Sequence, residues 1–279
     1  MIEPIRLYYK NGKIRSERYY NTNNKLHRDD EPAYIRYYEN GCIIAEEYYI
    51  NGEMHRDGAP AYYLYYESGK LESVSFHLNG KCHKEDGPAW IEYYENGNIS
   101  YEEYYISGRK HKEDGPACIG YYENGNIKYE EYYINGLCHR ENDPAWIEYH
   151  KNGNIESEEY YVNGNTHRED GPAYIEYNEN GKIIRQIYYL NDKIHKEDGP
   201  ARIDHDEYGN ITNKHYIHGV CYDCEYGQYV LKLNKNIILN ENDINKLKIM
   251  KIVCMENNYK ELLELVESKI IALQLSKHI

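Results

Sequence analysis

A histidine, a basic residue and an acidic residue follow one another seven times in this sequence. Such a triplet has the residue types for a metal site or for acid–base catalysis. The triplets recur every 28 residues, from His27-Arg28-Asp29 to His195-Lys196-Glu197. Their histidines are His27, His55, His83, His111, His139, His167 and His195.

The regular spacing argues against both kinds of chemistry. If each repeat is a β-hairpin, equivalent residues of adjacent repeats lie two strands apart, about 9–10 Å. A zinc ion needs each nitrogen ligand at about 2.0–2.1 Å, so neighbouring repeats cannot share one. We expect instead that the His and Asp side chains bond the backbone of the segment that crosses to the next repeat. The basic and acidic side chains are expected to interleave along one edge.

Four pairs of adjacent glutamates have the composition of a catalytic carboxylate dyad but not its geometry. Consecutive residues of a strand point to opposite faces of the sheet, so the two carboxylates of a pair are not expected to meet. The outward members would form an acidic stripe, which either attracts a basic partner or keeps the sheet soluble. The pairs are Glu46-Glu47, Glu102-Glu103, Glu130-Glu131 and Glu158-Glu159.

The segment "HYIHGVCYDC" contains four permissible zinc ligands, where an eighth copy of the repeat decays. Ten contiguous residues seldom surround a tetrahedral ion, and its two histidines also occupy ordinary positions of the repeat. We therefore predict no bound metal and no cofactor. The weak alternative is a zinc site formed by His215, His218, Cys221 and Cys224.

The 28-residue period organises the rest of the chain. In "PAWIEYYENG" the residues Ala89, Ile91 and Tyr93 alternate with the period of a strand, and Asn96-Gly97 is a strong hairpin-turn signal. "NISYEEYYISG" then predicts the returning strand, and "RKHKEDGP" crosses to the next repeat. Each repeat is therefore predicted to be one β-hairpin.

A lone hairpin is barely stable in water, so the hairpins must stack edge to edge. We predict a mostly β fold, an elongated twisted array of antiparallel β-hairpin repeats over residues 1–222. Residues 223–279 are predicted to form a final strand and a small α-helical cap, with dimerisation through these helices as the alternative. The helical stripes are Ile244, Leu247 and Met250, then Tyr259, Leu263, Val266, Ile270 and Leu273.

Tyrosine dominates the aromatic residues, with 36 Tyr against one Phe and two Trp. A ring with a hydroxyl suits a sheet that has no second layer to cover it. One column shares its face with isoleucines, which we take as the more buried face: Tyr37, Tyr65, Tyr93, Tyr121, Tyr149 and Tyr177. The opposite column, which also includes Cys118, varies more. Its aromatic members are the candidate binding residues Tyr34, Tyr62, Trp90, Trp146 and Tyr174.

Charge and cysteine content limit the classes of partner and location. The chain has 47 acidic against 33 basic residues, a formal net charge of −14, which disfavours nucleic acid and anionic membranes. Seven cysteines at unrelated positions of the repeat do not predict a disulfide framework. No signal peptide or membrane span is evident. We expect an intracellular protein that is not secreted.

The segment "YYENGNIKYEEYYING", Tyr121 to Gly136, resembles the variant class of MORN repeats. The longer unit with "HxEDGPA" resembles repeat proteins encoded by large DNA viruses of amoebae. The resemblance covers about residues 4–222 and implies hairpin arrays that serve as scaffolds or contact surfaces. If it extends to a viral origin, it implies the host cytoplasm as the location.

The leading functional hypothesis is a non-catalytic repeat scaffold that mediates protein–protein interaction with an unidentified partner. The alternative is a carbohydrate-binding surface, because aromatic faces such as those of Trp90 and Trp146 stack on sugar rings. No nucleophile–base pair or cofactor motif supports a third hypothesis, an enzyme, so we predict that the protein is not one.

Overall fold

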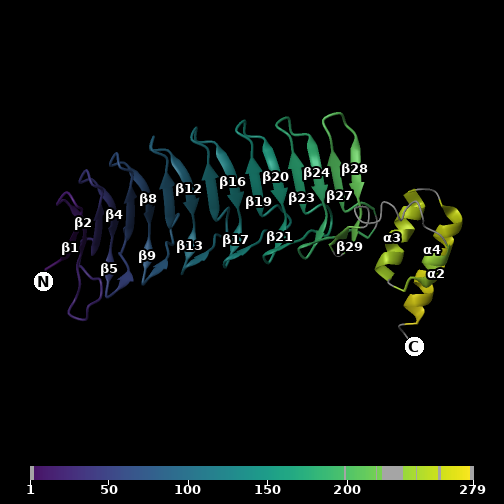
Figure 1. Cartoon of the computed structure of the whole chain (residues 1–279), viewed down its shortest axis with the longest axis horizontal. Helices are drawn as coiled ribbons and strands as arrows, with labels where there is room; N and C mark the ends of the chain where they lie inside the picture. Colours follow the sequence, from purple (N-terminus) through teal and green to yellow (C-terminus); the bar gives the residue numbers. More distant parts are fainter. Residues whose placement is uncertain are drawn as a thin grey trace. The chain divides into compact units, whose positions relative to one another are not determined.

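The computed structural model describes residues 3–197, 199–217, 219–221, 235–242, 244–256 and 259–276. Sixteen longer strands pair antiparallel, in the order in which they follow one another along the chain (Figure 1). The predicted fold class, hairpin repeats followed by a small helical region, is confirmed. Internal contacts divide the chain into a first unit, residues 1–155, and a second unit, residues 156–279.

The first unit contains the longer strands that carry most of the features discussed below. They are β1 (Ile5–Tyr8), β2 (Ile14–Arg18), β3 (Tyr34–Tyr37), β4 (Ile43–Glu47), β7 (Tyr62–Tyr65), β8 (Leu71–Ser75), β11 (Trp90–Tyr93), β12 (Ile99–Glu103), β15 (Cys118–Tyr121), β16 (Ile127–Glu131) and β19 (Trp146–Tyr149). The second unit begins within β20 (Ile155–Glu159) and continues with β23 (Tyr174–Tyr177), β24 (Ile183–Ile187), β27 (Arg202–His205) and β28 (Ile211–Lys214).

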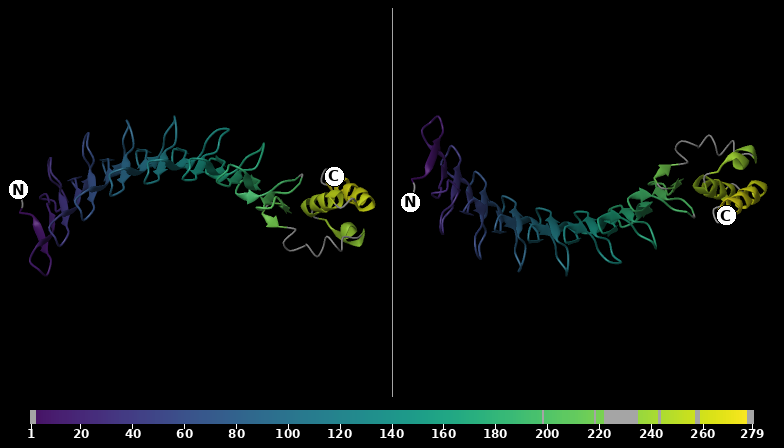
Figure 2. Two further views of the ribbon diagram at one scale, coloured as in Figure 1. Left: turned by 90° about the horizontal axis from the view of Figure 1, so that it is seen from above. Right: turned by 90° about the horizontal axis from the view of Figure 1, so that it is seen from below.

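Each repeat also contains a second, shorter hairpin, so the prediction of one hairpin per repeat is wrong. Pairs of two-residue strands form it, and Figure 2 shows these and the longer hairpins from two sides. In the first unit they are β5 (Tyr49–Ile50) with β6 (Glu53–Met54), β9 (His77–Leu78) with β10 (Lys81–Cys82), β13 (Tyr105–Ile106) with β14 (Arg109–Lys110), and β17 (Tyr133–Ile134) with β18 (Leu137–Cys138). In the second unit they are β21 (Tyr161–Val162) with β22 (Asn165–Thr166), β25 (Tyr189–Leu190) with β26 (Lys193–Ile194), and β29 (Tyr216–Ile217) with β30 (Val220–Cys221).

The physical reason for the second hairpin is a break in the predicted returning strand at Tyr104. The Tyr104 N–H donates to the carbonyl of Ala117 in the next repeat (2.8 Å), while its own carbonyl accepts from the His111 N–H (3.0 Å). Between these bonds, Ser107 and Gly108 both have positive φ (52° and 80°), as a two-residue hairpin turn requires. Each repeat therefore has two turn signals, here Ser107-Gly108 in addition to the predicted Asn96-Gly97.

The predicted turn at Asn96-Gly97 is confirmed, in a longer form. Gly97 has φ of 93° and its N–H donates to the Tyr94 carbonyl (2.8 Å). The Asn96 side chain accepts from the Asn98 N–H (2.8 Å). The strand register shifts between Glu92 and Tyr93, so this hairpin has a bulge next to its turn.

The tyrosine column that shares its face with isoleucine ties a repeat to the one before it, except at Tyr93, where Val74 replaces the accepting glutamate. Tyr65 donates its hydroxyl hydrogen to Glu46 (2.8 Å), and Tyr121 donates to Glu102 (2.7 Å). Burial, followed by the hydrogen bond to Glu46, raises the pKa of Tyr65. The same bond joins Tyr37 to Glu17, Tyr149 to Glu130 and, in the second unit, Tyr177 to Glu158.

Where a second tyrosine follows, it ties its repeat to the one after it, whereas His150 and Asn178 occupy this position in later repeats. The Tyr66 hydroxyl donates to the Tyr93 carbonyl, and the Tyr94 hydroxyl to the Tyr121 carbonyl, both at 2.7 Å. Tyr9, Tyr38 and Tyr122 make the equivalent bond. The repeated Tyr-Tyr pair therefore links a repeat in both directions.

A third aromatic position lies under the basic residue of the crossing triplet. The Lys112 ammonium lies 3.7 Å from the centre of the Tyr104 ring, and the Arg56 guanidinium lies 3.9 Å from the Tyr48 ring. These are cation–π distances. The cation is thus held on a ring, not in the edge ladder that we expected, although Arg28 and Arg140 also contact Glu31 and Asp143. The remaining pairs are Arg28 with Tyr19, Lys84 with Phe76, Arg140 with Tyr132, Arg168 with Tyr160, and Lys196 with Tyr188.

The crossing histidines have a structural role, but their partner is the short turn of the next repeat and not the crossing segment that we predicted. His111 accepts through Nδ1 from the Asn135 N–H in the short turn of the next repeat (3.1 Å), and its Nε2 faces Glu113 at 4.0 Å. His27, His55, His83 and His167 accept the equivalent bond from Asn51, Asn79, Ser107 and Asn191.

The predicted difference in burial between the two faces of the sheet is wrong. Ile35 and Ile147 are buried on the isoleucine face, but Cys118 and Glu103 are buried on the opposite face. An alanine after each crossing proline is fully buried in every repeat, for example Ala89. The short hairpins add contacts to the opposite face that the sequence analysis did not anticipate.

The described residues of the second unit continue with three helices, α2 (Lys235–Asn240), α3 (Ile244–Glu256) and α4 (Lys260–Leu275). Ile238, Leu247, Cys254 and Val266 form their fully buried core. Met250, Leu263, Ile270 and Leu273 from the predicted stripes pack against it. Within the described ranges no helix is long and apolar enough to cross a membrane. The boundary predicted after residue 222 lies outside the described residues, and capping and dimerisation stay predictions.

The cation–π contacts predict a measurable loss of stability for Lys112→Gln. Removing the ammonium from the half-buried Tyr104 ring should destabilise the array by about 1 kcal/mol, seen as a lower midpoint of urea unfolding. Lys10→Gln removes the same charge from an exposed position and should leave the midpoint unchanged. Equal midpoints for the two variants would contradict a stabilising role for the contact.

The histidine bond predicts a local effect of His111→Ala on hydrogen exchange. Without the Nδ1 acceptor, the Asn135 amide should lose about 1 kcal/mol of protection and exchange roughly fivefold faster. The Asn79 amide, which His55 holds in the same molecule, is the internal control. Unchanged exchange at Asn135 would show that the turn does not depend on the histidine.

Candidate functional site

The candidate binding residues lie on the face of the sheet opposite the isoleucines, which we call the column face. Across the first unit, paired residues form one row on this face: Tyr34, Glu47, Tyr62, Ser75, Trp90, Glu103, Cys118, Glu131 and Trp146. Glu47 thus lies between Tyr34 and Tyr62. Tyr174 belongs to the second unit, where it pairs with Glu159 and Ile187.

All five candidate rings are half-buried. The guanidinium of Arg18 lies 4.6 Å from the Tyr34 ring centre and donates to its hydroxyl (3.2 Å). The Trp90 indole donates to Glu92 (3.1 Å), and Tyr174 donates to Glu176 (3.3 Å). Because carboxylates and small residues separate the rings, they do not form a continuous aromatic strip. The carbohydrate hypothesis gains no support from this geometry.

Buried carboxylates of the row are held by side chains from the short hairpins. Tyr49 of β5 donates to Glu47 (2.9 Å), and Tyr105 of β13 donates to Glu103 (3.1 Å). The Lys110 ammonium lies 2.6 Å from Glu103. Burial lowers and the bond to Glu103 raises the pKa of Lys110, and the net shift is upward.

The cysteine of the row is not a reactive thiol. Cys118 is fully buried and burial raises its pKa to about 12. A nucleophilic cysteine needs a lowered pKa and access to substrate, and Cys118 has neither.

One Ser–His contact, which the sequence analysis missed, lies in the same row. Ser75 Oγ is 2.9 Å from His77 Nε2. Ser75 is only 1% exposed, and His77 Nδ1 has no hydrogen-bond partner among the described residues, so nothing orients the imidazole as a base. The pair occupies the positions that Glu47 and Tyr49 take one repeat earlier, and it replaces their hydrogen bond.

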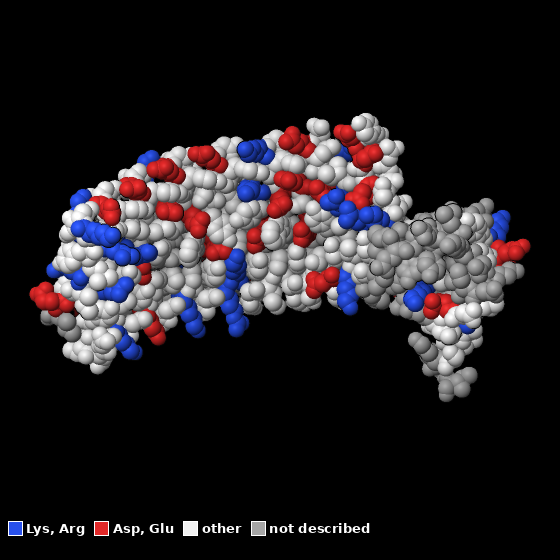
Figure 3. Space-filling view, in the orientation of Figure 1, with Lys and Arg blue, Asp and Glu red and all other residues white. Residues whose placement is uncertain are grey.

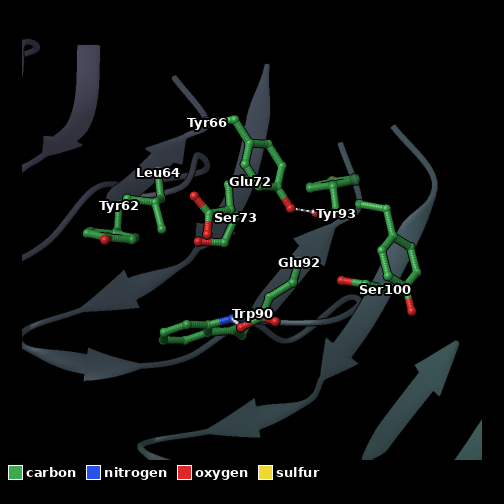
Figure 4. Close-up of a pocket in the computed structure, with 10 residues that line it drawn as sticks. Tyr62, Leu64, Tyr66, Glu72, Ser73, Trp90, Glu92, Tyr93 and Ser100 are labelled. Carbon is green, nitrogen blue, oxygen red and sulfur yellow. Dashed lines mark hydrogen bonds between the residues drawn. The ribbon is translucent and has the colours of Figure 1, made fainter. Parts of the chain in front are cut away.

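Two adjoining hollows indent the column face. The first hollow, about 250 Å³, lies between the side chains of Tyr62 and Leu64 on one side and Ser100 on the other (Figure 4). The second hollow, about 300 Å³, shares Glu92, Tyr94 and Ser100 with it. The first hollow is lined by Tyr62, Leu64, Tyr66, Glu72, Ser73, Trp90, Glu92, Tyr93, Tyr94 and Ser100.

A missing side chain shapes the second hollow. A Cβ on Gly120 would lie 2.3 Å from a ring carbon of Tyr129, so only glycine leaves room for that ring. The Tyr129 ring centre is 6.2 Å from that of Tyr101. The ammonium-bearing side chain of Lys128 also lines this hollow.

A bulge places a carboxylate in the first hollow. The register between β7 and β8 shifts between Leu64 and Tyr65, so Glu72 has no partner across the ladder. A bulge of this kind re-aims a side chain. Glu72 accordingly lines the hollow beside its neighbour Ser73.

The carboxylates of the column face differ in their partners. Glu103 faces Lys110, and Glu47 faces Arg36 at 3.5 Å. Glu72 and Glu92 have no basic partner within the described residues. Acidic side chains also recur along the edge of the first unit formed by the long turns, where Glu39, Glu67, Glu95 and Glu123 are exposed (Figure 3).

The acidic pairs and the weak zinc candidate can be compared with their predictions. Glu46 bonds Tyr65 on one face and Glu47 bonds Tyr49 on the other, so the prediction that such pairs are not dyads is confirmed. His215 is buried. His218, Cys224 and the Cys221 side chain lie outside the described residues, so the zinc candidate stays untested. Elsewhere in the described chain, no three potential ligands cluster.

A family model for the MORN repeat variant matches five stretches of the chain, residues 5–22, 89–107, 117–135, 145–163 and 173–191. The last four stretches each contain both long strands of a repeat and end in or next to the turn of its short hairpin. No curated protein matches the chain. The resemblance to viral repeat proteins stays a prediction.

Burial of Glu131 predicts a pH-dependent effect of Glu131→Gln. Burial is the main cause that raises its pKa, so the folded protein binds this proton more readily than the unfolded chain. The protonated carboxyl contributes to the free energy of unfolding below the pKa of the unfolded chain. This contribution is lost as the pH rises through the pKa of the folded protein. Glu131→Gln should therefore raise the urea midpoint at about pH 7 and have little effect below about pH 4.

The exposed Glu39→Gln serves as the control, with no expected change at either pH. A lower midpoint for Glu131→Gln near neutral pH would contradict a net cost of the ionised carboxylate.

Proposed function

We propose that the protein is a non-catalytic repeat scaffold that binds a protein partner on the column face of its first unit. The proposal is supported by the location of the sequence differences between repeats. On the isoleucine face, equivalent positions are nearly identical, whereas on the column face they change from repeat to repeat.

The two positions that alternate on each first strand illustrate the contrast. Facing the isoleucines, the repeats have Ile35, Tyr63, Ile91, Ile119 and Ile147, and a tyrosine two residues later in each. Facing the column, the equivalent position is Arg36, Leu64, Glu92, Gly120 and Glu148. A face with a fixed backbone frame and variable side chains suits the recognition of one particular protein.

The histidines and basic residues that could suggest a catalytic or metal site instead hold the backbone frame together. The crossing histidines accept backbone bonds and the crossing cations lie on aromatic rings. Repeats of the matched type are often protein-interaction modules, and the family is generally non-enzymatic. Cys42, Cys82, Cys118, Cys138 and Cys254 form no disulfide, which supports an intracellular location for the scaffold.

The proposal predicts that a charge reversal on the column face abolishes partner capture. The full chain, Glu92→Lys and Glu39→Lys would each be immobilised, and captured proteins quantified by mass spectrometry from the organism's lysate. The partner should bind Glu92→Lys at least about tenfold more weakly than the parent. The substitution replaces a carboxylate of the interface by a positive charge, which repels a basic group of the partner. Glu39→Lys, at an exposed turn, should capture it normally.

The purified partner would then be titrated into each form by calorimetry, with circular dichroism to verify the fold. Equal affinity for the parent and Glu92→Lys, or equal losses for both variants, would contradict a partner site on this face.

A further inference from the structure

We propose that the first hollow binds the guanidinium group of an arginine side chain presented by the partner. The inference rests on the proposed function and adds the chemistry of the contact. It is carried by a comparison between two repeats of this same chain, one of which already contains an arginine in the equivalent place.

The reference is Arg185 in the second unit. In the ladder it lies between Glu176 and Asp204, which flank it on the neighbouring strands. Its Nη1 donates to Glu176 (2.8 Å) and its Nε donates to Asp204 (2.7 Å). One guanidinium thus bridges two carboxylates across three strands, the geometry for which its planar fork of donors is suited.

In the first unit the equivalent of Arg185 is Ser73, which lies between Leu64 and Glu92 in the ladder. The small side chain leaves open the space that an arginine fills in the second unit, and this space is the first hollow. Glu92 corresponds to Asp204. The second carboxylate is supplied by the bulge residue Glu72, where the second unit has Ile184. The hollow therefore keeps two carboxylates but lacks the cation.

The walls of the hollow are held in place by bonds of their own. The Trp90 indole donates to Glu92 and leaves the other carboxylate oxygen available. Tyr66 donates to the Tyr93 carbonyl (2.7 Å), the bond drawn in Figure 4, which fixes the rim. Tyr62 and Trp90 add aromatic faces, on which a guanidinium stacks favourably. A bound arginine would thus meet fixed carboxylates and rings.

Three comparisons favour an arginine in the first hollow. The neighbouring second hollow contains Lys128 and lacks Glu72, so it does not offer the same unpaired negative charge. An anionic ligand in the first hollow would face Glu72 and Glu92, on a chain with a formal net charge of −14. Lysine brings the charge but not the planar fork that Arg185 uses to reach two carboxylates.

The test uses the fluorescence of Trp90 in the full chain. Trp90 and Trp146 are the only tryptophans, so Trp146→Phe makes Trp90 the single reporter. The probe is the blocked tripeptide acetyl-Gly-Arg-Gly-amide. Its matched controls contain lysine, or citrulline, which has the shape of arginine without its charge. Titrations would be repeated in Glu92→Gln, Ser73→Arg and the exposed Glu39→Gln, all in the Trp146→Phe background.

The arginine peptide should give a saturable change in emission, with the citrulline peptide at least about tenfold weaker and lysine in between. Glu92→Gln should weaken arginine binding to a similar extent. Ser73→Arg, which fills the hollow from within, should abolish it, and Glu39→Gln should not change it. Equal binding of citrulline and arginine, normal binding by Ser73→Arg, or no response to arginine would each overturn the inference.

The two proposals fail separately. If Glu92→Lys loses the partner while the parent ignores the arginine peptide, the scaffold proposal stands and the arginine inference is wrong. If the hollow binds arginine while Glu92→Lys still captures the partner, the guanidinium site stands and the partner does not use this face.

Discussion

The whole structure depends on one constraint: a lone β-hairpin can neither pair the backbone hydrogen-bonding groups at its edges nor bury its apolar side chains. Each repeat therefore uses its neighbours, through the ladder and through side chains that reach across it. Tyr65 bonds backward to Glu46, Tyr66 bonds forward to Tyr93, and Tyr48 carries the cation of the next crossing. Because three aromatic positions per repeat have these separate roles, and most require a hydroxyl, tyrosine is abundant and phenylalanine nearly absent.

The repeat, the long hairpins and the helical stripes were predictable because each has a local signal, such as the period of the triplets or glycine at Gly97. The second hairpin was not predicted, because the apolar pattern of the returning strand continues through Tyr104. The strand ends there because the Tyr104 N–H bonds the carbonyl of Ala117, which belongs to another repeat. The column face was predicted from alternation. The hollow was not, because it depends on a bulge at Glu72 and on the short side chain of Ser73 at a particular position in the ladder.

The repeat that contains the first hollow departs from its neighbours at several linked positions. Ser75 and His77 replace a glutamate and a tyrosine, and Phe76 replaces the tyrosine that carries the crossing cation. Val74 replaces the glutamate that Tyr65 bonds in the preceding repeat. Ser75 with His77, and Phe76 with Lys84, preserve their contacts in another form, whereas Val74 removes the acceptor that Tyr93 would use. The backbone frame of this repeat is kept while the shape and charge of the column face change. The column face can therefore vary while the backbone frame stays the same.

After the leading copy, each kind of bond between repeats joins residues a fixed number of positions apart, such as His27 with Asn51 and Tyr66 with Tyr93. Excision or duplication of one complete 28-residue unit within the array would therefore bring equivalent donors and acceptors together again. The length of the array can change during evolution by whole units without the invention of a new contact, whereas a change of any other length must be absorbed in a turn, as the extra residue between Tyr20 and Leu26 is in the leading copy.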